Sequence, residues 1–305
     1  MEKFTEYLII KAYSKRSIES ITKAVEYFLR WSEQENIHDI TEVSHNDVMA
    51  YVKCCNAKGT GRKTVAHYIM HLKKYFEFLQ EEGEVNDNPC SNIKIKGIKR
   101  KVLYEILTMQ ELESLYNSYS TEIKIEGVKY APPQQINELS RKRNKMILGL
   151  LIWQGLRSEE ITRLELQDLK LREGKIFIAG SKRTNERTLK LESHQIFDLL
   201  DYVNETRKQL LEHRQITTTK LFIGTGSSER FSNTMSYLNK QLHQINNKVK
   251  DLKQIRTSVI THWLKLYNLR KVQVMAGHRY VSSTESYKAN NMEELKEDIK
   301  NYHPF

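Results

Sequence analysis

The chain is poor in glycine and proline, the residues that turns need most often. Its 305 residues include only 12 Gly and 4 Pro, too few for the many turns of an all-β fold. We therefore expect a mainly α protein. The length corresponds to roughly two domains, each large enough to bury a hydrophobic core.

Several features predict a cytoplasmic protein without a membrane anchor. No apolar run reaches the roughly 18 residues that span a bilayer. The N-terminal residues lack the charged, apolar, small-residue order of a signal peptide. The three cysteines are the adjacent pair Cys54 and Cys55 and the isolated Cys90. This spacing suits neither a disulfide framework nor a zinc site.

Positive charge decides the expected class of partner. The net charge is +11, which favours a polyanion such as double-stranded DNA. The charge is most concentrated in residues 94–103, which contain no acid. The five cations there are Lys94, Lys96, Lys99, Arg100 and Lys101.

The same region interrupts helical periodicity at Gly83, Asn88–Pro89 and Gly97. It predicts a basic interdomain linker over residues 86–104, between a helical N-terminal domain (1–85) and a larger C-terminal domain (105–305). Such a strap is either a flexible, solvated connection or a segment that follows a phosphate backbone. Five cations without a counter-charge favour the second interpretation.

One helix of the first domain, from Arg62 to Gln80, has a polar face with a basic centre. Its apolar residues recur at helical spacing, and Lys63, His67, His71 and Lys74 fall on the opposite side. This is either an ordinary solvated face or the face of a helix that enters a DNA groove. The DNA-contact residues that we expect in this domain are Arg62, Lys63, His67, His71 and Lys74.

Local signals also divide the second domain into elements. Thr108 and Glu111 predict a capping box that opens a helix, and residues 144–154 predict a strongly apolar helix. The segments Lys175–Ala179 and Thr188–Leu191 predict the two strands of a β-hairpin. The stretch around Pro132 and Pro133 is interpreted as a loop or small hairpin, and the rest as mostly helical.

Four separate pieces of the second domain carry the chemistry. They are the turn Gly155-Leu156-Arg157, Lys182 in the hairpin turn, Lys253 three residues before Arg256, and Gly277-His278 nine residues before Tyr287. Each piece is weak alone, but their order and spacing together resemble the tyrosine recombinase (phage integrase, Xer-like) family. The resemblance covers nearly the whole chain.

The resemblance implies an N-terminal core-binding (SAM-like) domain and a mixed, mostly helical catalytic domain with a small β-hairpin or sheet. It also implies site-specific recombination through a 3′-phosphotyrosine, for integration, excision or resolution. A terminal helix at about residues 291–302 would exchange between protomers and link a homo-tetramer on DNA. The alternative, in which this helix docks on its own domain, stays open.

The expected chemistry also follows from the side chains. Arginines stabilise negative charge on phosphoryl oxygens, a role we assign to Arg157 and Arg256. Tyr287 is the expected nucleophile. Lys182 is the expected general acid for the leaving 5′-oxygen, and His278 is expected to donate a hydrogen bond to a phosphate oxygen. Glu160 either buttresses the site or is solvated. Because the acids are scattered, we expect no metal and no cofactor.

Lys253 departs from the family pattern, which usually has a histidine there. An ammonium does not easily accept the tyrosine proton, so we assign Lys253 to phosphate binding and leave the base unidentified. His262, six residues after Arg256, is interpreted as structural. Two other functions remain possible at this point: a type IB topoisomerase-like relaxation activity, and a DNA-binding regulator that has lost catalysis.

Overall fold

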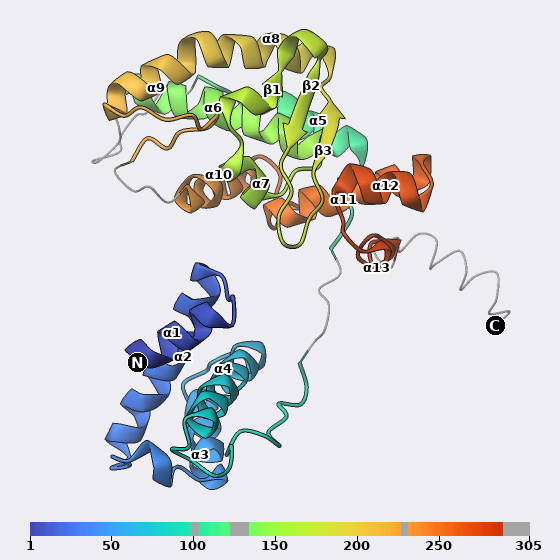
Figure 1. The fold of residues 1–305 in the computed structure, drawn as a ribbon. Helices are drawn as coiled ribbons and strands as arrows, with labels where there is room; N and C mark the ends of the chain where they lie inside the picture. The colour runs from blue at the N-terminus through green and yellow to red at the C-terminus, as the bar shows by residue number, and fades with distance from the viewer. Residues whose placement is uncertain (99–103, 123–133, 227–230, 289–305) are drawn as a thin grey trace, which may run out of the picture. The chain divides into compact units, whose positions relative to one another are not determined.

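The computed structural model describes residues 1–98, 104–122, 134–226 and 231–288 (Figure 1). It divides into two compact units, Met1–Val102 and Leu103–Phe305, and each has its own hydrophobic core. The expectation of a mainly α protein with a small sheet is confirmed. In the described ranges, every helix is too short or too polar to cross a bilayer.

The N-terminal unit is a set of helices packed around aromatic side chains such as Phe28 and Phe76, both fully buried. Helix α4 packs along α2, where the rings of Tyr27 and Tyr68 lie 5.8 Å apart. A capping box of Ser44 with Asp47 opens α3. The elements are α1 (Glu2–Ile10), α2 (Lys15–Gln34), η1 (Ile40–Glu42), α3 (His45–Ala57) and α4 (Arg62–Glu81).

The first half of the predicted linker packs on the N-terminal unit. Ile93 and Ile95 contact its core, whereas the alternating Lys94 and Lys96 are exposed. Gly97 has φ +74°, and a Cβ there would collide with the Arg62 guanidinium at the start of α4. The three remaining cations of the linker, Lys99, Arg100 and Lys101, lie outside the described residues.

The second unit surrounds the long, buried helix α6. Its sheet is antiparallel with strand order β1-β2-β3, and Ile176 pairs with both Leu169 and Leu189. The elements are α5 (Met109–Asn117), α6 (Gln134–Ile152), α7 (Ser158–Arg163), η2 (Leu166–Asp168), β1 (Leu169–Lys170), η3 (Leu171–Glu173), β2 (Lys175–Ile178), β3 (Arg187–Lys190), α8 (Ser193–Asp201), η4 (Tyr202–Thr206), α9 (Arg207–Arg214), α10 (Ser232–Ile245), α11 (Leu252–Leu266), α12 (Leu269–Ala276) and α13 (Val281–Glu285).

One predicted boundary in this unit is wrong, and one strand was not predicted. Helix α6 begins at Gln134, ten residues before the predicted start. Several polar side chains of its first half are buried, and that of Arg143 donates to the Ile223 carbonyl at 2.7 Å. The two-residue strand β1 is too short to produce a sequence signal. The segment around Pro132 and Pro133 and the expected exchange helix at 291–302 lie outside the described residues.

Helix α11 holds the start of the second unit along one of its faces. The Tyr104 hydroxyl donates to Asp251 at 2.7 Å, and the Leu107 N–H donates to the Ser258 hydroxyl at 2.9 Å. His262 Nε2 lies 2.8 Å from the Leu107 carbonyl and must donate to it. The structural interpretation of His262 is therefore confirmed. The residues that follow the linker are thus fixed to the helix that carries Lys253 and Arg256.

Candidate active site

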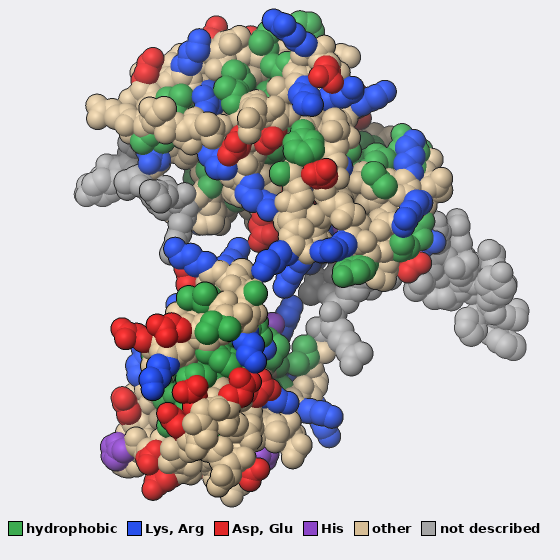
Figure 2. Space-filling model, in the orientation of Figure 1, with side chains coloured by type: hydrophobic (Ala, Val, Ile, Leu, Met, Phe, Trp, Pro, Cys, Tyr) green, Lys and Arg blue, Asp and Glu red, His purple; other side chains and the backbone are tan. Residues whose placement is uncertain are grey.

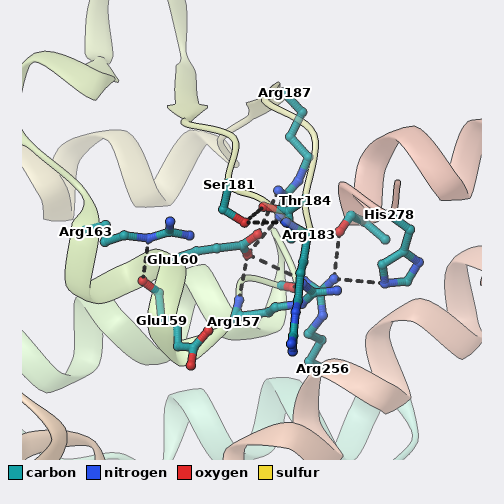
Figure 3. A network of polar contacts seen from close by, with 12 residues as sticks. Arg157, Glu159, Glu160, Arg163, Ser181, Arg183, Thr184, Arg187, Arg256 and His278 are labelled. Carbon is teal, nitrogen blue, oxygen red and sulfur yellow. Dashed lines mark hydrogen bonds and ion pairs between the residues drawn. The ribbon is translucent and has the colours of Figure 1, made fainter. Parts of the chain in front are cut away.

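Arg256 lies at the centre of a buried polar network (Figure 3). It is 3% exposed and projects from α11 between two turns of the chain. Its guanidinium donates to the Gly155 carbonyl and, at 2.7 Å, to the Ala276 carbonyl. Its Nε has no hydrogen-bond partner among the described residues. Two backbone carbonyls therefore fix the guanidinium, while one buried donor remains unsatisfied.

Glu160 and Arg187 form a fully buried ion pair next to Arg256. The Nη1 and Nη2 atoms of Arg187 each donate to one oxygen of the Glu160 carboxylate at 2.9 Å, and each side chain is 1% exposed. The second Glu160 oxygen lies 3.7 Å from Arg256 Nη1. The arginines hold the pKa of Glu160 below its ordinary value, although burial alone would raise it. The solvated alternative for Glu160 is therefore wrong.

Arg157 is placed by the turn between α6 and α7. Gly155 has φ +56°, and a Cβ there would lie 3.1 Å from the Trp263 ring, so glycine is required. Arg157 is the N-cap of α7, and its backbone N–H donates to Glu160 at 2.9 Å. The residue as a whole is half-buried.

The turn at Gly277 joins His278 to the β-hairpin. Gly277 ends α12 in the left-handed conformation, with φ +65°, and a Cβ there would collide with Arg187. The Asn185 N–H donates to the Gly277 carbonyl at 3.1 Å, and Thr184 pairs with His278 as a β-bridge. Consequently, His278 is 2% exposed, with Nε2 3.3 Å from Arg256 Nη2.

Tyr287 follows α13 and lies against His278. The two rings are nearly parallel, at 19°, with centroids 5.5 Å apart. The tyrosine also packs on a small cluster that includes Ile260 and Val272. The structure therefore brings Arg157, Glu160, Arg256, His278 and Tyr287 together from segments that span residues 157–287.

The electrostatics of the cluster favour an anionic ligand. Arg157, Arg187 and Arg256 carry three positive charges against one negative charge on Glu160, which leaves +2. Burial, followed by the charge of Arg256, lowers the pKa of His278 to about 3, so its imidazole is neutral at pH 7. Burial also lowers the pKa of Arg256 to about 10. Such a site suits a phosphate whose negative charge increases during a reaction.

The two expected lysines are exposed, unlike the buried residues of this cluster. Lys182 is exposed in the turn between β2 and β3, and its carbonyl accepts a hydrogen bond from Arg279 at 2.9 Å. Figure 2 shows basic side chains gathered at the edge of the second unit where this turn lies. Lys253 is exposed in the first turn of α11, and its Nζ lies 6.0 Å from the Tyr104 ring centroid.

Arg187 is the residue of the cluster that sequence reasoning missed. It is the first residue of β3 and alternates in phase with Leu189 and Leu191. The period of two along a strand places all three on one face. This alternation in the sequence could have predicted that Arg187 points toward the core rather than toward solvent.

In the N-terminal unit, the residues expected to contact DNA have different environments. Arg62, Lys63 and His67 are exposed on α4. His71 instead faces α2, where its Nε2 lies 3.4 Å from the Ser20 hydroxyl, and burial lowers its pKa. Lys74 donates to the Tyr13 hydroxyl at 2.7 Å. The packing of α2 against α4 therefore occupies part of the predicted polar face.

Helix α2 adds basic residues that the sequence reasoning did not single out. The Lys23 ammonium and the Arg30 guanidinium both lie over the Tyr27 ring, at 5.7 Å and 5.1 Å from its centroid. Since Tyr27 packs on Tyr68 of α4, these cations stand beside the α4 face. Their i, i+7 spacing on α2 was a detectable signal.

Comparison with known proteins places the chain in a family. Residues 106–294 match the phage integrase family, and residues 1–83 match the phage integrase N-terminal SAM-like domain. Tyrosine recombinase XerC of Oceanobacillus iheyensis is 26% identical over 318 residues, which cover 100% of this chain and 95% of that protein. TnP I resolvase of Bacillus thuringiensis is 23% identical and covers 98% of each chain.

A solved structure has the same fold. XerH site-specific recombinase, in a post-cleavage complex with palindromic difH substrate, gives a TM-score of 0.66 at 20% identity, covering 94% of this chain and 80% of that one. Fold and site thus define a tyrosine recombinase, a class that carries out site-specific DNA recombination. The chain belongs to the phage integrase family.

Proposed function

We propose that this chain cuts and rejoins DNA at specific sites, with Tyr287 as the nucleophile that forms a 3′-phosphotyrosine and frees a 5′-hydroxyl. The observation that carries the proposal is the convergence of three arginines and a neutral histidine beside Tyr287. Together with the Glu160 carboxylate these groups carry a net charge of +2, which matches a phosphodiester that gains a second negative charge as the phenol attacks. The phosphotyrosine keeps the energy of the cleaved bond, so religation needs no ATP.

Each residue of the cluster has a separate task in this reaction. Arg157 and Arg256 bind the non-bridging oxygens of the phosphate, with the unpartnered Nε of Arg256 as one available donor. The Glu160 carboxylate accepts hydrogen bonds from the Arg187 side chain and from the Arg157 N–H, and so holds β3 against the start of α7. Lys182 protonates the leaving 5′-oxygen. Lys253, which is exposed on α11, binds an adjacent phosphate.

The two units divide DNA binding from catalysis. Residues 1–85 form the core-binding domain, residues 86–104 the basic linker, and residues 105–305 the catalytic domain. Exposed Arg62, Lys63 and His67 on α4 contact DNA, and Lys23 and Arg30 of α2 extend that surface. His71 and Lys74 contact DNA at the margin of the same face.

The active assembly is a tetramer on DNA, joined by the segment at about residues 291–302. The catalytic unit exposes large apolar side chains that such a segment would cover: Leu266 is 72% exposed, Val274 61% and Tyr280 66%. A lambda integrase tetramer bound to a Holliday junction has the same fold as this chain, with a TM-score of 0.61 at 12% identity. A recombinase of this kind acts in the cytoplasm, where its DNA lies.

The proposal is tested with a nicked suicide substrate and a denaturing gel. Wild type is expected to form a covalent adduct and Tyr287→Phe none, because only the hydroxyl is removed. DNA affinity should stay within about twofold, since the phenyl ring keeps its stacking on His278. An adduct in the phenylalanine variant would remove Tyr287 from the reaction.

Assays of the wild-type protein on DNA with and without target sites distinguish recombination from the two alternative functions. A recombinase joins strands from two target sites and does not relax a supercoiled plasmid that lacks them. Relaxation of a site-free plasmid would favour the topoisomerase-like activity. Site-specific binding without an adduct in wild type would favour a regulator that has lost catalysis.

A further inference from the structure

Both ring nitrogens of His278 have a partner inside the protein. Nε2 lies 3.3 Å from Nη2 of Arg256, and Nδ1 lies 2.8 Å from the Thr284 hydroxyl. His278 is 2% exposed and Thr284 is fully buried. Solvent therefore does not supply an alternative partner for either nitrogen.

The partners determine where the imidazole carries its proton. A guanidinium only donates hydrogen bonds, so Nε2 of His278 must accept the bond from Arg256. The imidazole is neutral at pH 7, since burial and Arg256 lower its pKa to about 3. Its single proton is therefore on Nδ1, and Thr284 accepts that hydrogen bond.

Thr284 also connects this histidine to the nucleophile. It lies in α13, and its carbonyl accepts the Tyr287 N–H at 3.0 Å. The Tyr287 ring in turn stacks on His278. The threonine thus contacts His278 through its side chain and Tyr287 through its backbone.

We propose that Thr284 is a positioning residue for strand cleavage, whose hydroxyl reverses its hydrogen bond to His278 when the scissile phosphate binds. The inference rests on the proposed function of the site. To donate to a phosphate oxygen, Nε2 must carry a proton. Through transient opening of the site, the imidazole then gives its Nδ1 proton to a water molecule and takes one proton from water on Nε2, so its charge does not change. Arg256 Nη2 gives up its bond to Nε2 and keeps its bond to the Ala276 carbonyl. The Thr284 hydroxyl rotates from acceptor to donor and keeps the bond.

A hydroxyl suits this task because it both donates and accepts. A backbone carbonyl or a carboxylate in the same place would hold the proton on Nδ1 in both states. Because Thr284 is fully buried, its hydroxyl also holds the plane of the ring, which fixes the direction of Nε2 toward the phosphate site.

The kinetic test compares Thr284→Val, which removes the hydroxyl at nearly constant volume, with Thr284→Ser, which keeps it. At saturating suicide substrate, we expect the valine variant to cleave roughly tenfold slower or worse, and serine to stay within about threefold of wild type. Thr261→Val is the matched control, because Thr261 is also buried and, among the residues that the structure describes, its hydroxyl bonds only to the Thr257 carbonyl, at 2.9 Å. Wild-type rates in Thr284→Val, or equal loss in the serine variant, would overturn the proposal.

The proton position is measured directly by ¹⁵N NMR of the His278 ring. We expect protonated Nδ1 in the free protein and protonated Nε2 in Tyr287→Phe bound to intact target DNA. Protonated Nδ1 in both states would overturn the reversal. This readout needs no cleavage, so it separates failure of the Thr284 proposal from failure of the proposed function, which absence of a wild-type adduct would signal.

Discussion

At the scale of single residues, the ion pair of Glu160 with Arg187 makes a sharp stability prediction. Glu160→Gln leaves the Arg187 guanidinium buried without a counter-charge, which costs about 3 kcal/mol or more. Glu173→Gln breaks a pair with Lys175 whose side chains are 54% and 43% exposed, and should cost less than about 1 kcal/mol. Urea unfolding of both variants measures the difference. Equal, small losses would show that the buried pair does not hold the site together.

The same pair shows what the sequence predicts at this scale and what it does not. The spacing from Arg157 to Tyr287 predicts which groups have the chemistry for phosphate, because that chemistry belongs to each side chain. It does not predict Arg187 as the partner of Glu160, because the two meet only when β3 docks beside α7. Nor does it predict the depressed pKa of His278, which arises from burial among three arginines.

At the scale of elements, the turn between β2 and β3 is held against the His278 turn by Arg279, which donates to the Lys182 carbonyl at 2.9 Å. Lys182→Ala should slow cleavage of an ordinary 5′-oxygen substrate by about 100-fold or more. A 5′-thiol leaving group needs no proton, so the same variant should cleave it at nearly the wild-type rate. Suicide-substrate kinetics with both leaving groups measure this.

Arg279→Ala extends this prediction to the whole turn, because it loosens Lys182 without removing it. We expect a smaller loss, of about tenfold, that is also restricted to the 5′-oxygen substrate. Lys190→Ala changes an exposed lysine on β3 and is the control. If both leaving groups slow equally in Lys182→Ala, then Lys182 is not the general acid.

Local signals predict those elements whose ends are set by neighbouring residues. The capping box at Thr108 opens α5, and the alternating strands form the hairpin. Local signals do not predict the first half of α6, because its polar side chains bond to groups that are distant in the sequence, such as the Ile223 carbonyl. Two-residue β1 exists because β2 pairs with it, and no periodicity develops over so short a segment.

At the scale of the whole molecule, the linker is anchored at both described ends. Ile93 and Ile95 pack on the N-terminal unit, and Tyr104 bonds to Asp251 at the start of α11. The sequence predicted the charge of this segment but not its anchors, because they depend on tertiary contacts. Exposed Lys94 and Lys96 therefore extend from a fixed segment rather than from a free tether.

This arrangement predicts the salt dependence of DNA binding. Each cation that neutralises a phosphate releases counterions, so the slope of log affinity against log salt becomes shallower by about 0.9 for each phosphate that a variant no longer neutralises. Replacing Lys94, Lys96, Lys99, Arg100 and Lys101 by Gln should therefore flatten the slope by several units. The ratio of specific to non-specific affinity should change little, since bonds to phosphate position the protein without reading bases.

Two comparisons make that measurement decisive. The double variant Lys170→Gln, Arg172→Gln removes two exposed charges near the small sheet. Because salt screens charges that do not touch DNA, the slope of log affinity against log salt should change by well under one unit. Lys63→Gln, on the exposed α4 face, should leave about one phosphate without a neutralising cation and so flatten the slope by about 0.9. If the five linker substitutions leave the slope unchanged while Lys63→Gln flattens it, DNA is bound by the helices alone and the linker is a solvated connection.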